Sequence, residues 1–85
     1  MANDYTGNPF YIDTSSGAYT GGVKILSIHW TGAANGDDLI LYDTAGRVFV
    51  NHKSNGSDYH GEGYGMVNGI EPGTVDGGSV WIYIE

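Results

Sequence analysis

The nine-residue run Val23–Thr31 (VKILSIHWT) most constrains how this chain can fold. Five of the eight residues from Val23 to Trp30 are apolar, and no Gly or Pro interrupts them. Glycines stand immediately before and after the run, so both of its ends are marked by chain-breaking residues. The run is short and rich in β-formers, which predicts a strand rather than a helix.

Side chains alternate between the two faces of a strand. One face of this run is wholly apolar and is predicted to point into the core: Leu26, Ile28 and Trp30. The other face is half apolar and is predicted to be covered by a partner strand or a neighbouring subunit: Val23, Ile25, Ser27 and His29.

Glycine accounts for 15 of the 85 residues and lies between apolar runs without a fixed period, as in short strands joined by tight turns. Further strands are predicted at Phe10–Ile12, Asp38–Asp43, Arg47–His52, Met66–Ile70, Thr74-Val75 and Ser79–Glu85. The fold class is therefore all-β, a small antiparallel β-sandwich or barrel of about six short strands. Residues 1–9 are predicted to form an extended N-terminal arm, and residues 10–85 a single β domain.

The segment from Asp38 to His52 predicts a hairpin at the centre of this fold. Its turn is Asp43-Thr44-Ala45-Gly46, in which Asp caps the turn and Gly accepts a positive φ. The next segment, Lys53–Gly65, is polar and rich in Gly and Ser, which predicts a flexible loop. At the end of the chain, Val80, Ile82 and Ile84 are expected to face one way, and Trp81 and Tyr83 the other.

The net charge of −7 argues against two classes of partner. Nucleic-acid binding needs Lys and Arg to displace counterions, and anionic membranes attract the same residues. The chain has no Cys and no membrane-length apolar run, so disulfides are excluded and no membrane span is expected. A chain of this size buries only about 60–65% of its unfolded surface, so association with other chains is the expected source of added stability.

No catalytic constellation, cofactor site or metal site is predicted. Asp37 and Asp38 are adjacent, so their side chains point apart on a strand rather than forming an acid–base pair. The competing class is a small hydrolase that uses Asp37, Asp38 or His60. A metal-binding alternative rests on His52, Asp58, His60 and Glu62, but they lie on a Gly/Ser-rich segment with no zinc or EF-hand spacing.

Eleven aromatic residues, seven of them Tyr, indicate a binding surface. Exposed Tyr and Trp suit both a protein interface and the stacking of sugar rings, and the sequence does not separate the two. The predicted contact surface for other subunits comprises Val23, Ile25, Trp81 and Tyr83. Tyr59 and Tyr64 are the candidates for glycan contact, because the composition of their loop predicts that it is the most exposed.

The order of motifs resembles a group of small tailed-phage virion structural proteins. In that group a V-K-I-x-x-I-x-W-x-G strand is followed by G-D-x-L-x-L-x-D-x-x-G, which Val23–Gly32 and Gly36–Gly46 match. Val67–Ile70 and Gly78–Ile84 are also similar, so the resemblance covers about residues 11–85. It implies a virion component of the capsid decoration, cement or tail-associated type, with no catalytic residues to transfer.

Together, composition and resemblance predict a non-enzymatic, homo-oligomeric capsid decoration protein, with a trimer as the expected assembly. Its expected partner is the major capsid protein or another virion protein, and its expected place is the capsid surface after synthesis in the host cytoplasm. The acidic charge suits an outer position, because a protein lining packaged DNA is expected to be basic. The alternative is a glycan- or host-surface-binding module of a tail or fibre.

Overall fold

The computed structural model describes residues 3–15 and 17–85, which form one antiparallel sheet of six strands. The strands are β1 (Phe10–Ile12), β2 (Tyr19–Thr31), β3 (Asp38–Tyr42), β4 (Val48–Lys53), β5 (Tyr59–Val75) and β6 (Ser79–Ile84). Their order in the sheet is β1-β6-β2-β5-β3-β4. The all-β prediction is confirmed, and the described residues contain no helix, hence none long and apolar enough to cross a membrane.

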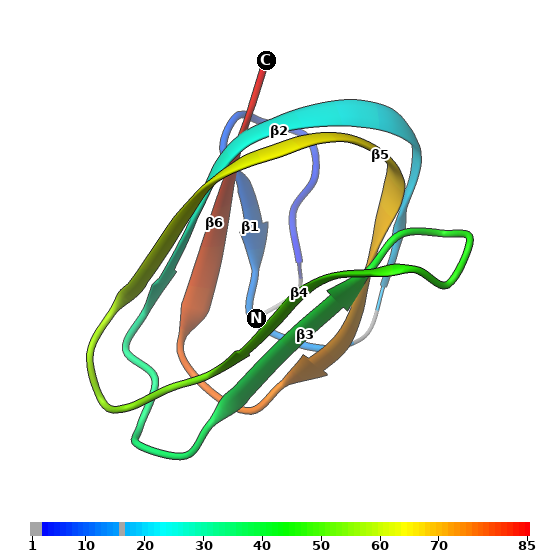
Figure 1. Ribbon diagram of the computed structural model, residues 1–85. Helices are drawn as coiled ribbons and strands as arrows, with labels where there is room; N and C mark the ends of the chain where they lie inside the picture. The colour runs from blue at the N-terminus through cyan, green and yellow to red at the C-terminus, as the bar shows by residue number, and fades with distance from the viewer. Residues whose placement is uncertain (1–2, 16) are drawn as a thin grey trace.

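The two long strands, β2 and β5, form the frame of the molecule. β5 pairs with β2 through residues 59–70 and with β3 through residues 71–75, so it joins the two ends of the sheet. Figure 1 shows both strands bending sharply along their length. A register shift lies at Gly21-Gly22 of β2, between the pairs Thr20–Gly69 and Val23–Val67, and Gly21 and Gly69 have the positive φ that glycine adopts at little cost.

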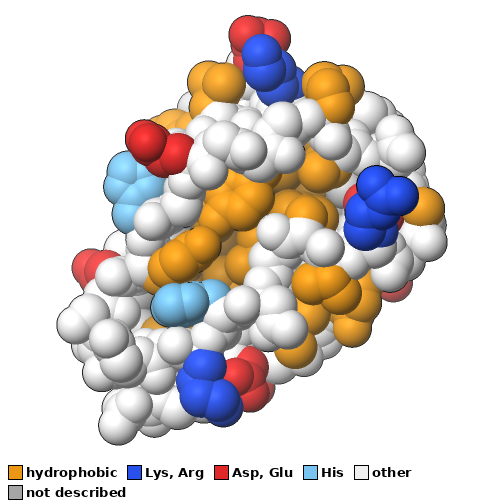
Figure 2. Space-filling model, viewed as in Figure 1, with side chains coloured by type: hydrophobic (Ala, Val, Ile, Leu, Met, Phe, Trp, Pro, Cys, Tyr) orange, Lys and Arg blue, Asp and Glu red, His pale blue; other side chains and the backbone are white. Residues whose placement is uncertain are grey.

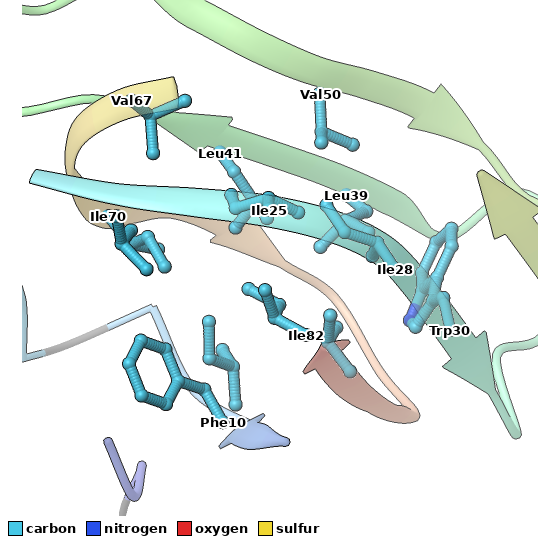
Figure 3. Packing of buried hydrophobic residues seen from close by; sticks show 13 residues of the cluster. Phe10, Ile25, Ile28, Trp30, Leu39, Leu41, Val50, Val67, Ile70 and Ile82 are labelled. Atoms are coloured by element: carbon cyan, nitrogen blue, oxygen red, sulfur yellow. The ribbon is translucent and has the colours of Figure 1, made fainter. Parts of the chain in front are cut away.

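This curvature gathers side chains from all six strands into one core. Thirteen buried hydrophobic residues form a single cluster, and Figure 3 shows them packed between the strands. Trp30 is the largest fully buried side chain. Its indole N–H donates a 2.8 Å hydrogen bond to the carbonyl of Gly77, which attaches β2 to the turn before β6.

The predicted hairpin is confirmed as β3 and β4. The Asp43 carboxylate accepts hydrogen bonds from the backbone N–H groups of Ala45 (3.0 Å) and Arg47 (2.9 Å), and Gly46 has φ +87°. Leu39 and Leu41 are fully buried, as their shared face predicts. The predictions of a short edge strand at Phe10–Ile12 and of a C-terminal strand are also confirmed.

The predicted inward face of the Val23–Thr31 run is wrong in its first half. A bulge lies between Ile25 and Ser27, where β2 carries one residue more than β6 opposite it. Val23 and Ile25 therefore point into the core before the bulge, and Ile28 and Trp30 after it. Leu26 is the extra residue and is 46% exposed.

The polar segment predicted to be a loop is largely strand. Within Lys53–Gly65, the residues from Tyr59 onward belong to β5, which runs without interruption to Val75. The expected separate strands Met66–Ile70 and Thr74-Val75 are parts of this one element. Pairing with β2 on one side provides the backbone hydrogen bonds that local composition does not predict.

The N-terminal arm folds back on its own chain. Asp4 and Tyr11 exchange two backbone hydrogen bonds of 2.8 Å. The side-chain amide of Asn8 donates to the carbonyl of Ile84 (2.8 Å) and accepts from the N–H of Ile84 (3.1 Å), which continues the contact between β1 and β6 to the last residue of β6. Residues 3–9 thus cover one end of the sheet, whereas the first two residues of the predicted arm lie outside the described residues.

Candidate functional site

A row of aromatic side chains crosses four neighbouring strands on the outer side of the sheet. Tyr11 of β1 pairs with Trp81 of β6, Trp81 pairs with His29 of β2, and His29 pairs with His60 of β5. Residues directly opposite in antiparallel strands share a face, so these four rings lie on one surface. Tyr83 lies on the same face, two residues after Trp81. We call these five residues the outer aromatic face.

The rings of the outer aromatic face contact one another in two groups. The Tyr11 and Trp81 ring centroids lie 4.6 Å apart, and the His29 and His60 rings are stacked at 4.0 Å. The Tyr83 ring meets His29 edge-on at 5.2 Å. Neighbouring strands are about 4.8 Å apart, so a row over four strands extends about 14 Å. The two groups adjoin, because Trp81 and His29 are opposite each other in the β2–β6 register.

Polar groups fix and border this surface. The Tyr11 hydroxyl donates to a carboxylate oxygen of Asp13 (3.2 Å) and lies 3.1 Å from the Ser79 hydroxyl. The Glu62 carboxylate lies 3.5 Å from Nε2 of His60. Tyr11 is therefore held in place by its own strand and by β6, while Glu62 remains 75% exposed.

Of the four residues predicted to form a subunit contact, the structure brings two to this surface. Trp81 and Tyr83 are 37% and 40% exposed, in agreement with the alternation predicted for β6. Val23 and Ile25 are buried in the core of the same chain, because the bulge in β2 turns them inward. Their assignment to an exposed contact surface is therefore corrected.

The two tyrosines predicted to contact glycans form a second, half-buried cluster. The Tyr59 and Tyr64 hydroxyls are 2.9 Å apart, and the Tyr59 ring stacks on His52 at 4.1 Å. Phe49 meets Tyr64 edge-on at 6.4 Å. Tyr59 and Tyr64 thus bridge β5 and β4 instead of standing free as a platform.

Burial raises the pKa of Tyr64 far above its ordinary value of 10.0, and the adjacent Tyr59 hydroxyl raises it further. The Tyr64 hydroxyl therefore remains protonated well above neutral pH.

The three residues of the hydrolase alternative serve different parts of the fold. The Asp37 carboxylate accepts the backbone N–H of Ala34 (2.9 Å) and so closes a loop. The Asp38 carboxylate pairs with the Lys53 ammonium at 3.0 Å across the hairpin. His60 lies in the outer aromatic face. None of these contacts joins a carboxylate of Asp37 or Asp38 to His60.

The four residues of the metal-binding alternative are likewise divided. His52 stacks on Tyr59, and the Asp58 carboxylate accepts the backbone N–H of Gly32 at 3.3 Å. His60 and Glu62 remain together on the outer face. Within residues 3–15 and 17–85, no three His, Asp or Glu side chains converge in a way that could hold a metal ion.

Sequence reasoning missed Tyr11, His29 and His60 as members of the outer aromatic face. Each lies on a different strand, and only the register of β1, β6, β2 and β5 brings them beside Trp81. The sequence contained a partial signal, because His29 was assigned to a half-polar face that was predicted to contact a partner strand or a neighbouring subunit.

Comparison with known proteins adds no relative from which a function could be transferred. No family model, curated protein or solved structure matches this chain.

Proposed function

We propose that this protein is a non-enzymatic structural component of a bacteriophage virion, of the capsid decoration or cement type, which binds another virion protein through the outer aromatic face. The phage context rests on the sequence motifs that resemble small virion proteins. The observation that supports a binding role is the row of partly exposed rings at paired positions of β1, β6, β2 and β5.

The energetics of such a surface favour burial against a partner. Tyr and Trp are enriched at protein interfaces, where large rings lose contact with water at little conformational cost. Leu26 and Met66 are further exposed apolar side chains of β2 and β5, and Met66 pairs with Lys24 on the outer side of the sheet. In a capsid, many copies would bind in fixed geometry, so modest contacts per copy would give strong attachment.

The test combines sedimentation with binding to virus particles that lack the protein. We expect the purified protein to sediment as a homo-oligomer, with a trimer as the specific expectation, and to bind the particles. Trp81→Asp places a charge in the aromatic row and should abolish particle binding. Val48→Asp, at an exposed position of β4, is the matched control and should bind normally. A stable monomer that does not bind particles would contradict the proposal.

The second candidate function is glycan binding by a tail or fibre module. The specific observation in its favour is that carboxylates of Asp13 and Glu62 border the same rings, since sugar recognition combines ring stacking with hydrogen-bond acceptors. The platform would be Tyr11 and Trp81, because Tyr59 and Tyr64 bond to each other. Glycan-array binding that Trp81→Ala removes would favour this candidate, and an array without hits would exclude it.

A further inference from the structure

We infer that the occupant of the outer aromatic face is an arginine-bearing, basic surface of another protein. This inference rests on the proposed function and deepens it, since it states the chemistry of the partner. Two features of the face lead to it, namely the charge at its border and the character of its rings.

The first feature is an excess of negative charge around the rings. The Glu62 carboxylate is largely exposed beside His60, and the Asp13 carboxylate lies against Tyr11. Glu85 follows β6 and is also exposed, with its carboxylate 3.6 Å from the Lys24 ammonium. Lys24 is the single cationic side chain among these border residues, so three carboxylates outnumber it. A complementary partner is therefore positive.

The second feature is that the exposed rings suit a guanidinium group. Arg stacks on the faces of Trp and Tyr while its N–H groups donate to carboxylates, and Arg is enriched in interfaces together with these aromatic residues. Trp81, Tyr83 and Tyr11 offer ring surface, and the exposed Glu62 carboxylate lies beside His60 on the same face. A partner that stacks an arginine on these rings could therefore also place an N–H donor on the Glu62 carboxylate.

A second copy of this chain does not fit the same face. The chain has three Lys and Arg residues, and two of them, Lys24 and Lys53, already pair with Glu85 and Asp38. Figure 2 shows each Lys or Arg on the visible side lying next to an acidic side chain. Arg47 alone cannot form a basic surface, so contact between copies would bring like charges together. The homo-oligomer is accordingly expected to use another surface.

The experiment titrates the full chain with a labelled peptide of four Gly-Arg repeats and follows fluorescence anisotropy. A peptide with citrulline in place of arginine keeps the shape and loses the charge. The chain has two Trp, of which Trp30 is buried, so a change in Trp emission reports on Trp81. We expect the arginine peptide to bind and shift this emission, and the citrulline peptide to bind at least tenfold more weakly.

Matched variants separate the face from the net charge. Glu62→Gln and Glu71→Gln each remove one negative charge, but Glu71 lies on the part of β5 that pairs with β3. We expect Glu62→Gln and Trp81→Ala to weaken arginine-peptide binding at least fivefold, and Glu71→Gln to change it less than twofold. Equal losses for Glu62→Gln and Glu71→Gln would overturn the inference, because binding would then follow total charge alone.

Particle binding distinguishes failure of the inference from failure of the proposed function. If wild type and Glu62→Gln bound the particles equally and Trp81→Asp did not bind, the partner surface would be apolar. In that case only the inference would fail. If Trp81→Asp bound the particles as strongly as wild type, the outer aromatic face would not be the binding surface, and the proposed function would be contradicted. Weaker binding by Glu62→Gln than by Glu71→Gln, with a loss of affinity on raising the salt concentration, would support both.

Discussion

At the scale of single residues, the environment decides the role of each tyrosine. Tyr64 is half-buried, bonds to the Tyr59 hydroxyl and contacts Phe49. Tyr83, in contrast, is exposed in the outer aromatic face. The pKa of Tyr64 is raised, so its neutral form is favoured in the folded state. The two hydroxyls lie above Gly61, at which a Cβ atom would meet the Tyr64 oxygen.

The raised pKa of Tyr64 predicts a loss of stability at alkaline pH. Unfolded tyrosines ionise near their ordinary pKa of about 10, whereas folded Tyr64 ionises at higher pH. Its contribution to stability is therefore complete below about pH 10 and is lost as the pH rises through the folded pKa. We expect the free energy of unfolding, measured by urea titration between pH 8 and 11, to decline less steeply above pH 10 in Tyr64→Phe than in wild type. Identical slopes for Tyr64→Phe and wild type would contradict this account.

At the scale of secondary-structure elements, one inserted residue determines which side of β2 is buried. The bulge between Ile25 and Ser27 reverses the alternation, so that Ile25 and Ile28 both point inward and Leu26 points outward. Bulges also increase the local twist, and β2, which carries this bulge and a second register shift at Gly21-Gly22, bends along its length in Figure 1. The same bend allows the sheet to enclose one core.

This reversal predicts opposite outcomes for two substitutions two positions apart. Leu26→Ser removes an exposed side chain and should change the free energy of unfolding by no more than about 0.5 kcal/mol. Ile28→Ser leaves a cavity and a buried hydroxyl, and should cost about 3 kcal/mol or more. Urea denaturation followed by circular dichroism measures both. A similar, large loss for both substitutions would show that β2 is not bulged at this position, because regular alternation places Leu26 and Ile28 on the same face.

At the scale of the whole molecule, the chain ends hold the sheet together. The Asn8 side chain forms two hydrogen bonds with the backbone of Ile84, and the N–H of Glu85 donates to the carbonyl of Lys24 (3.1 Å). Tyr5 packs edge-on against Phe10 at 5.4 Å. Residues near both termini thus cover the end of the sheet that contains β1 and β6.

The Asn8 contacts predict that the arm contributes to global stability. Asn8→Ala removes both side-chain hydrogen bonds to Ile84 and should lower the free energy of unfolding by about 1 kcal/mol. Asn51→Ala changes an exposed position of β4 and serves as the control, with an expected effect within about 0.5 kcal/mol. Thermal unfolding of the three proteins gives the comparison. If Asn8→Ala were as stable as wild type, the arm would not be bound in solution as it is in the structure.

The sequence by itself determined the fold class, the β3–β4 hairpin and the alternation of β6. These features depend on local chemistry: Asp43 and Gly46 specify a turn, and the regular alternation in Ser79–Glu85 sends Val80 and Ile82 inward and Trp81 outward. Of the residues now placed at the candidate site, only Trp81 and Tyr83 were predicted as contact residues, because they occupy the exposed face of a regularly alternating strand.

Only the tertiary structure decided the course of β5, the inward turn of Val23 and Ile25, and the outer aromatic face. A Gly-rich segment such as Tyr59–Gly65 has no strand signal of its own and becomes a strand because β2 supplies its hydrogen-bond partners. A bulge depends on a mismatch of length between paired strands, which no single run of sequence contains. The aromatic face exists because register aligns one residue from each of four strands, and register is a property of the pairing rather than of any one strand.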